Sequence, residues 1–541
     1  MPSTAVHEGA ASLRATGAEL LHWTGGVAVH CAIAVLLGAL AARSMRRHHL
    51  HWSWAAIVGA LLLVERPRLF GWCFTLALGA LLAAGRGRRW HREDLEAGAD
   101  LADIATQRTR PLDLVQRLAR ELTERLRQRL AGAAQLRRGE LQLGVDERGR
   151  RVSIPFPTAH GAGGTHILVV GATGSGKTVT QSLIAVRAIE RGMGAVVVDP
   201  KGDAGLRAHV RAAASAAGRQ FIEWSPAGEC VYNPYARGGA SEIADKLLAG
   251  ERFTEPHYLR QAQRYLGHAV RALHDSAVEV SLQAIVEQLD PQNLEQLARE
   301  LPERQAHATF AYLDSMSARQ LAELAGVRDR LAILAESDVG RWLDPQTPSA
   351  RRFELLSAVR ARAVVYFSLQ SDSRPLLSAM LGAAIVQDLQ TTVAALQEDP
   401  VPTLVAIDEF SALAAEQVVG LFGRARSAGF SLLLGTQELS DLRLAGRERL
   451  LEQVLGNLSV LIAHRQVVPS SAELIAAIAG SKGAWKLTRH SDGRSTRTRT
   501  REHVLEPDRV MSLGRGWAAV LALGDGHSAR VTRISAPPNA R

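Results

Sequence analysis

The feature that most constrains this chain is an apolar run that passes through a glycine-rich turn into a helix-like stretch, HILVVGATGSGKT followed by VTQSLIAVRAIERG. The short apolar run from His166 to Val170 predicts a buried strand, and the stretch after the turn predicts a helix. A strand joined so closely to a helix is the building block of α/β folds, so we expect an α/β domain. The turn has the form G-x-x-x-x-G-K-[ST] and consists of Gly171, Ala172, Thr173, Gly174, Ser175, Gly176, Lys177 and Thr178.

These residue types suit the binding of phosphate groups. Glycines let backbone N–H groups turn inward around an anion, and the positive end of the following helix dipole points at it. In such a loop the Lys177 ammonium reaches the β- and γ-phosphates, and the Thr178 hydroxyl binds Mg²⁺. The sequence therefore predicts a nucleotide site that takes ATP with Mg²⁺.

Two acidic strand ends follow along the chain. GAVVVDPKGD, residues 194–203, predicts a second strand and a βαβ unit, in which Asp199 either faces the phosphate site or forms a turn with Pro200. TLVAIDEF, residues 403–410, predicts a third strand that ends in Asp408 and Glu409. We expect Asp408 to hold the Mg²⁺ shell and Glu409 to act as the general base on the attacking water.

A fourth strand, FSLLLGTQ, ends at Gln437, which could sense the γ-phosphate or position water. Because ligands bind at the carboxyl ends of strands in such sheets, we expect these ends to meet. Arg424 and Arg426 lie at the end of the helix before this strand. One of them, with Arg426 preferred, could reach the γ-phosphate of a neighbouring subunit, or both could simply stabilise the helix C-terminus.

The N-terminal part has a different composition. Three apolar runs, near residues 25–42, 52–64 and 69–85, predict two or three transmembrane segments and a membrane anchor over residues 1–92. Basic clusters follow the first and the third run. Both clusters lie in the cytoplasm if three segments cross with the N-terminus outside, and the large C-terminal part is cytoplasmic in either arrangement.

The rest of the chain divides into segments with different sequence patterns. Residues 93–136 predict a charged helical linker, and residues 240–345 predict an all-α domain inserted into a nucleotide-binding domain of residues 137–239 and 346–534, followed by a tail, 535–541. The basic, Ser/Thr-rich segment 486–504 is either an edge ribbon or loop that contacts phosphates, or a solvated hairpin.

Composition narrows the classes of protein. The 64 Lys and Arg against 54 Asp and Glu give a formal charge of +10, which favours a polyanionic partner such as nucleic acid or an anionic membrane surface, although compositional bias toward Arg also raises it. Three cysteines exclude a disulfide-stapled scaffold. A hydrophobic content of 47% excludes a chain disordered throughout.

Taken together, the motifs resemble the TraD/TraG-type coupling ATPases of type IV secretion and conjugation. The resemblance rests on HILVVGATGSGKT, VVVDPKGD, Asn233–Pro234, LVAIDEF and GRARSAGFSLLLGTQ, in this order. It implies a RecA-like P-loop ATPase domain with an inserted all-helical domain behind N-terminal transmembrane helices.

The resemblance also implies function and partners. The family would make this chain a hexameric ATP-driven motor at the bacterial inner membrane, passing DNA, single-stranded and bound to a relaxase, to the secretion channel. By position, Lys177 and Thr178 would bind nucleotide and Mg²⁺, Asp408 and Glu409 would serve hydrolysis, and Gln437 would couple it to motion. Two alternatives remain open: an FtsK- or HerA-like duplex DNA translocase, and a receptor that uses nucleotide only to recruit protein substrates.

Overall fold

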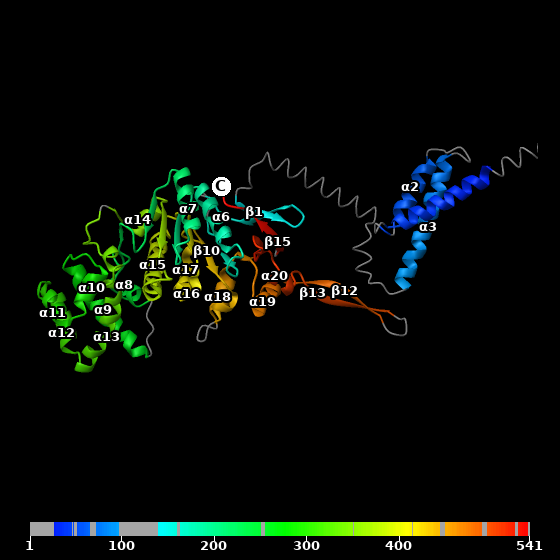
Figure 1. The fold of residues 1–541 in the computed structure, drawn as a ribbon. Helices are drawn as coiled ribbons and strands as arrows, with labels where there is room; N and C mark the ends of the chain where they lie inside the picture. The colour runs from blue at the N-terminus through cyan, green and yellow to red at the C-terminus, as the bar shows by residue number, and fades with distance from the viewer. Residues whose placement is uncertain are drawn as a thin grey trace, which may run out of the picture. The chain divides into compact units, whose positions relative to one another are not determined.

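The computed structural model divides the chain into two units. One contains residues 1–135 and 482–502, and the other contains residues 136–481 and 503–541. The structure describes residues 26–45, 47, 51–64, 72–96, 139–158, 163–249, 255–349, 351–413, 415–443, 449–489, 495–524 and 528–538. Figure 1 shows the elements of both units.

Three helices form the described N-terminal part: Gly26–Met45, α2 (Ser53–Val64) and α3 (Trp72–Glu96). They match the three predicted apolar runs. The helix α3 continues past residue 92, where we predicted the anchor to end, because the basic stretch after the apolar run contains no proline to stop it. The rest of the predicted linker, from residue 97 to 136, lies outside the described residues.

Small residues let these helices approach closely. A Cβ added at Gly38 would lie 2.7 Å from the Gly79 carbonyl oxygen, so the first helix crosses α3 at this pair. The outward side is apolar, with Leu36 61% and Leu61 63% exposed. Of the described helices, Gly26–Met45 and α15 (Pro375–Ala395) are long and apolar enough to cross a membrane, but α15 is 67% buried over its most apolar stretch and the first helix only 17%.

The second unit is built on an 11-stranded sheet in the order β2-β1-β15-β14-β11-β3-β10-β9-β4-β8-β5. The strands from β11 to β5 are parallel, and β14, β15, β1 and β2 extend the sheet with antiparallel pairs. The strands are β1 (Glu140–Asp146), β2 (Arg151–Pro155), β3 (Ile167–Val170), β4 (Gly194–Asp199), β5 (Phe221–Trp224), β8 (Val364–Ser368), β9 (Thr403–Ile407), β10 (Phe430–Thr436), β11 (Val460–Ala463), β14 (Trp517–Ala522) and β15 (Ser528–Ile534).

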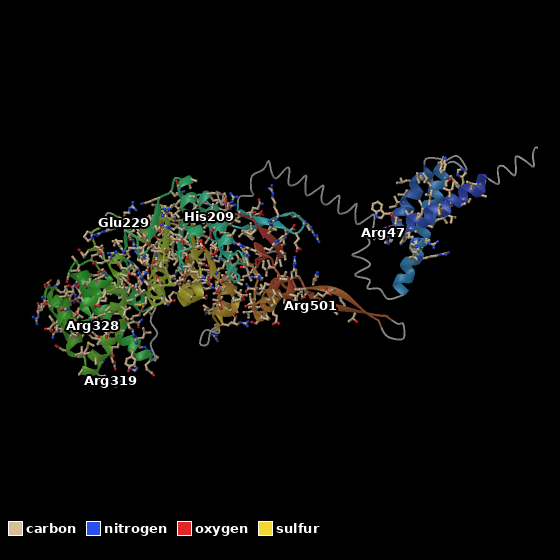
Figure 2. All side chains as sticks on the ribbon, viewed as in Figure 1. Arg47, His209, Glu229, Arg319, Arg328 and Arg501 are labelled. Atoms are coloured by element: carbon tan, nitrogen blue, oxygen red, sulfur yellow. The ribbon has the colours of Figure 1, made fainter. Side chains whose placement is uncertain are left out.

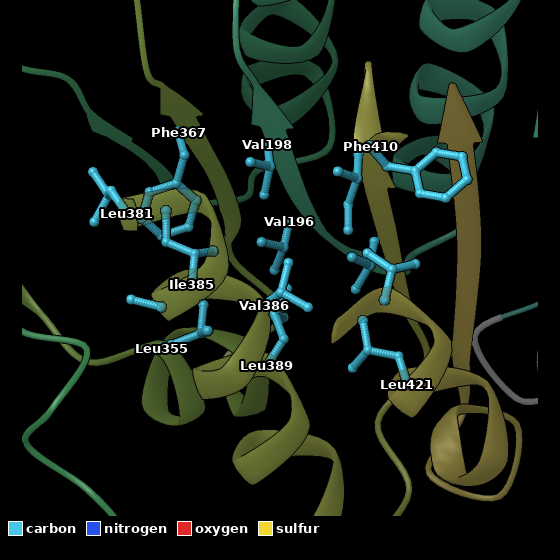
Figure 3. Close-up of a cluster of buried hydrophobic side chains, with 14 of the residues drawn as sticks. Val196, Val198, Leu355, Phe367, Leu381, Ile385, Val386, Leu389, Phe410 and Leu421 are labelled. Carbon is cyan, nitrogen blue, oxygen red and sulfur yellow. The ribbon is translucent and has the colours of Figure 1, made fainter. Parts of the chain in front are cut away.

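Helices cover both faces of the parallel strands. Alternate residues of β4 point to opposite faces, so Ala195 and Val197 join one core cluster while Val196 and Val198 join the other. The first cluster contains residues of α6 (Lys177–Glu190) and α7 (Ala204–Ala216). The second contains residues of α14 (Leu355–Arg360), α15 and α17 (Ala415–Ala425), as Figure 3 shows. Burial on both faces explains why these strands read as continuous apolar runs.

Between β6 and β7 the chain is helical. The described residues from 240 to 342 form α8 (Ala240–Leu248), α9 (Pro256–Asp275), α10 (Leu282–Gln288), α11 (Pro291–Arg299), α12 (Glu303–Asp314), α13 (Ala318–Ala335) and the 3-10 turn η1 (Gly340–Trp342). The core of these helices is continuous with the core behind the sheet. The short strands β6 (Cys230–Tyr232) and β7 (Arg351–Phe353), which the sequence did not reveal, pair in parallel where the chain leaves and re-enters the sheet body.

The C-terminal part adds small elements and a ribbon. The short helices are α16 (Phe410–Leu413), the 3-10 turn η2 (Leu439–Leu442), α18 (Leu450–Asn457), α19 (Pro469–Ala479) and α20 (Pro507–Met511). The strands β12 (Ser481–Arg489) and β13 (Ser495–His503) form a separate two-stranded sheet. Residues 486–489 and 495–503 of the basic segment thus belong to a two-stranded ribbon that is separate from the large sheet, neither an edge strand of that sheet nor a loop.

Candidate nucleotide site

The carboxyl ends of the central parallel strands meet at one edge of the sheet, as predicted. Val170 at the end of β3 is in register with Thr436 of β10 on one side and with Ala463 of β11 on the other. Ile407 at the end of β9 pairs with Leu434 of β10 and Val198 of β4. The side chains of the segments that follow these strands therefore lie at the same edge of the sheet.

The glycine-rich loop has a backbone that few other residues could adopt. Gly176 has a φ of 115° and Gly174 a φ of 76°, both in the left-handed region. At Gly171 an added Cβ would lie 2.6 Å from both the His464 Cβ and the Ser175 Oγ, so the loop fits tightly against the segment that follows β11. The buried hydroxyl of Ser175 has no hydrogen-bond partner among the described protein atoms. A loop that places glycines and an unpaired hydroxyl at the start of α6 fits an anion.

Lys177 opens α6 and reaches across to the end of β9. Its Nζ lies 2.6 Å from Glu409 Oε1 and 3.3 Å from Asp408 Oδ1. The three side chains are each about one-tenth exposed. The structure thus brings together the predicted lysine and the two predicted acids.

The Glu409 carboxylate accepts several hydrogen bonds through one of its two oxygens. Lys177, Lys201 and Gln437 all donate to the same oxygen, Oε1, at 2.6, 3.2 and 3.1 Å. Within the described part of the chain, Oε2 accepts no hydrogen bond. Its backbone has a φ of 45°, a strained value for a residue with a side chain. Burial raises the pKa of this carboxyl, but the two ammonium groups and Gln437 outweigh burial, so the pKa lies below its usual range and Glu409 is ionised.

Asp408 and Thr178 offer oxygen ligands at the same edge. The Gln181 amide donates to Asp408 Oδ1 at 3.0 Å, which fixes that carboxylate. Thr178 is half-buried on the first turn of α6. A carboxylate and a hydroxyl are the donors that Mg²⁺ prefers, so this pair fits the metal. Sequence reasoning did not select Gln181, although its position four residues after Lys177 places both on one face of a helix.

Asp199 forms the turn after β4. Its carboxylate accepts hydrogen bonds from the backbone N–H groups of Lys201, Gly202 and Asp203 and from the Tyr366 hydroxyl. Of the two roles that the sequence left open, the observed contacts are those of the turn former. The turn carries Lys201, whose ammonium pairs with Glu409. The pattern DPKGD alone assigns this lysine no role, because only the tertiary fold places it beside β9.

His464 packs against the glycine-rich loop. It follows β11, its Nδ1 lies 3.1 Å from the Trp517 carbonyl oxygen, and its Nε2 lies 2.8 Å from Thr180 Oγ1. Burial lowers the pKa of His464 to about 4, so the ring is neutral. A neutral ring with Nδ1 protonated donates to the carbonyl and accepts from Thr180. No sequence motif marks this histidine, although its place after a strand that ends at the same edge is a signal that could have identified it.

The two candidate arginines lie elsewhere. Arg424 and Arg426 precede β10, at the amino ends of the parallel strands and thus at the opposite edge from Lys177. Arg426 donates to the Asn457 carbonyl oxygen at 2.9 Å and to Ser459 Oγ at 3.2 Å, while the Arg424 side chain is exposed. Neither completes the site of its own chain.

The fold and this edge define an α/β nucleotide-binding protein, and comparison with known proteins narrows the class. The family model of the type IV secretion-system coupling protein DNA-binding domain matches residues 151–503. The match spans more than half of the chain, so the chain belongs to the type IV secretion-system coupling proteins. No curated protein matches it significantly.

Solved structures of the bacterial conjugative coupling protein TrwB have a similar fold. The unbound form is 19% identical, with a TM-score of 0.56 over 73% of this chain and 88% of that chain. TrwB with a non-hydrolysable ATP analogue is 18% identical, with a TM-score of 0.54 over 73% and 94% of the two chains. TrwB with ADP and Mg²⁺ is 18% identical, with a TM-score of 0.53 over 70% and 86%.

Proposed function

We propose that this protein is a membrane-attached ATPase of the RecA-like P-loop class that moves DNA toward a type IV secretion or conjugation channel. The observation that carries the proposal is the Glu409 carboxylate, ionised beside Lys177 and Asp408 at the edge where the phosphate-binding loop ends. A protein that only bound nucleotide would not need an acid in this position. The complexes of TrwB with an ATP analogue and with ADP and Mg²⁺ support nucleotide and metal binding at the matching fold.

Each residue of the nucleotide site has a distinct role in the proposed hydrolysis. The loop N–H groups and Lys177 bind the phosphates, and Lys177 exchanges its carboxylate partners for phosphate oxygens. Lys201 and Gln437 keep Oε1 of Glu409 fixed, which leaves Oε2 to take a proton from water as general base. Gln437, bonded to Glu409, links this carboxylate to the end of β10 and couples hydrolysis to motion.

Mg²⁺ would be held by Thr178 and Asp408 and would neutralise charge on the phosphates when bound. Gln181 positions Asp408 for this role by fixing Oδ1.

Assembly and location complete the proposal. The apolar outer surface of the N-terminal helices supports insertion, with two or three spans, in a bacterial inner membrane, and the sheet unit then lies in the cytoplasm. Arg426 or Arg424, which lie at the edge opposite the loop, would serve the site of the next subunit in a homo-hexamer. The partners are DNA carried with a relaxase and the channel components, and the helices α8–α13, as an inserted domain, would meet this substrate.

The test measures ATP turnover of the full-length protein in detergent, with and without single-stranded and duplex DNA. DNA should stimulate turnover, Lys177→Ala should abolish it, and Glu409→Gln should retain bound ATP while turnover falls about 10²–10⁴-fold. Turnover at the parental rate in Glu409→Gln would refute the assigned base. Turnover indifferent to DNA in an assembled protein would favour the protein-substrate receptor. Size measurement must accompany the assay, because an arginine supplied in trans makes monomers inactive.

A further inference from the structure

The ribbon β12–β13 concentrates positive charge. Residues 481–503 contain seven Lys and Arg against two Asp and Glu, a formal charge of +5, which is half of the charge of the whole chain. Among the described residues, the nucleotide site and the sheet core contain no side chain of this segment. Such a density on two strands requires an explanation, because like charges on neighbouring positions repel and destabilise a sheet.

The charges on the described part of the ribbon are not compensated. Lys482, Arg499 and Arg501 are exposed, and none of them forms an ion pair with another described residue. Figure 2 shows Arg501 on β13. On the sheet body, in contrast, the exposed Arg207 and Arg211 both pair with Glu223. The ribbon therefore presents cations that no described acid neutralises and that could bind a polyanion.

The geometry of β13 places its exposed arginines on one face of the ribbon. Arg499 and Arg501 are two positions apart on β13 and so lie on the same face. A Cβ added at Gly483 would lie 3.4 Å from Arg499 Nε, so the guanidinium group extends over the glycine of β12. Thr498 and Thr500 alternate with these arginines and bring hydroxyl donors to the other face. Guanidinium and hydroxyl groups are the side-chain donors that contact phosphate and sugar oxygens.

We propose that the β12–β13 ribbon binds the phosphate backbone of nucleic acid. The proposal rests on the proposed function, which gives the chain DNA as substrate, and it names the surface that contacts the DNA. A two-stranded ribbon has the dimensions to enter the major groove of a duplex and can also follow a single strand. An anionic membrane is the competing source of phosphate groups, since β12 carries Trp485 and Leu487, but β13, which bears Arg499 and Arg501, reads STRTRTREH and has no apolar residue to enter a lipid interface.

The test compares DNA binding by full-length protein carrying Arg499→Gln and Arg501→Gln with that of the parent over a range of salt concentrations. The probes are one labelled oligonucleotide as a single strand and as a duplex. We expect about tenfold weaker binding, and a salt slope smaller by about 1.4 for the single strand and about 1.8 for the duplex, since two phosphate contacts are lost. Turnover without DNA should stay at the parental value, and Arg499→Lys with Arg501→Lys should recover most of the affinity.

The matched control is Arg207→Gln with Arg211→Gln, which removes the same charge from arginines that are already paired and should leave DNA affinity nearly unchanged. Parental affinity and salt slope in the ribbon variant would overturn the inference while leaving the motor intact. If the ribbon variant instead loses binding to anionic vesicles and keeps DNA affinity, the partner is a membrane and the inference is also wrong. If the parent hydrolyses no ATP and binds no DNA, the proposed function itself fails.

Discussion

The described part of the sheet unit contains two buried lysine–carboxylate pairs, and they differ in how fully their hydrogen-bonding groups are satisfied. Lys246 of α8 donates to the Asp388 carboxylate of α15 at 2.9 Å and to the carbonyl oxygens of Pro234 and Arg237. Tyr232 donates to the other carboxylate oxygen at 2.8 Å. Every proton of the ammonium and both oxygens of the carboxylate are engaged.

The Lys177–Glu409 pair is incomplete by comparison. Three donors share one oxygen of Glu409, while Lys177 lies next to a loop shaped for an anion. The effect on the carboxyl groups differs accordingly. Burial raises the pKa of Asp388 despite Lys246 and Tyr232, whereas two lysines lower the pKa of Glu409 despite its burial. A saturated pair connects the inserted helices to the sheet body, and an unsaturated pair remains available for exchange with a ligand.

The largest expected effect comes from replacing each of the two acids, Glu409 and Asp388, by its amide. Glu409→Gln should lower turnover by about 10²–10⁴-fold because the proposed general base is lost, with little change in thermal unfolding. Asp388→Asn should instead destabilise the fold and leave the turnover of the folded fraction near the parental value. Turnover per folded molecule and the unfolding midpoint, measured on both variants, check this. Equal losses of turnover would abolish the distinction.

The next effect tests the saturated pair. Lys246→Met leaves an uncompensated buried carboxylate and should destabilise the protein by about 3–5 kcal/mol, whereas Lys246→Met with Asp388→Leu should recover much of this loss. Unfolding in urea, followed by tryptophan fluorescence, measures both. If the single and the double variant were equally unstable, the buried charge would not be the cause.

A smaller effect concerns the positioning of Glu409. Lys201→Gln removes one of the three donors on Oε1, and because Lys201 is half exposed we expect a loss near the low end for a bond to a charged group, about tenfold in kcat. The KM for ATP should change little, and Lys201→Arg should restore part of the rate. A rise in KM without a fall in kcat would show that Lys201 binds the nucleotide instead.

The smallest effect is a pH dependence from His464. Its pKa is lowered by burial from 6.5 to about 4, so folding favours the neutral ring. This contribution to stability is complete above pH 6.5 and is lost as the pH falls through that range toward 4. His464→Asn should therefore lose less thermal stability than the parent when both are acidified across this range. Parallel losses would assign the acid sensitivity to other groups.

The nucleotide site was largely predictable from sequence because its motifs are local. Lys177, Asp408, Glu409 and Gln437 each follow an apolar run, and parallel strands bring their ends to one edge without further information. The strands themselves were predictable because burial on both faces produces uninterrupted apolar segments. The β12–β13 segment remained open between an edge ribbon or loop that contacts phosphates and a solvated hairpin, since alternating Arg and Thr marks a strand without fixing its partner.

The supporting residues give only partial signals in the sequence: Gln181 lies one helical turn after Lys177 and His464 follows a strand, but neither position reveals the contact that the side chain makes. Lys201, Gln181 and His464 become neighbours of the site only through contacts between segments that are far apart in the chain. Lys246 looks in the sequence like any lysine on an amphipathic helix, yet its side chain is 1% exposed. Nothing in the spacing of KLLAG signals that α15 carries an aspartate to meet it.

Residues close together in the chain are enough to specify the strand–loop–helix unit, the acids at the strand ends and the apolar N-terminal runs. Contacts between distant segments, in contrast, set which donors hold Glu409, which lysine is a buried connection and which described basic residues have no acidic partner among the described residues. Those outcomes depend on packing, since a charge in water costs little wherever it lies, whereas a charge that folding buries must find its partner in space.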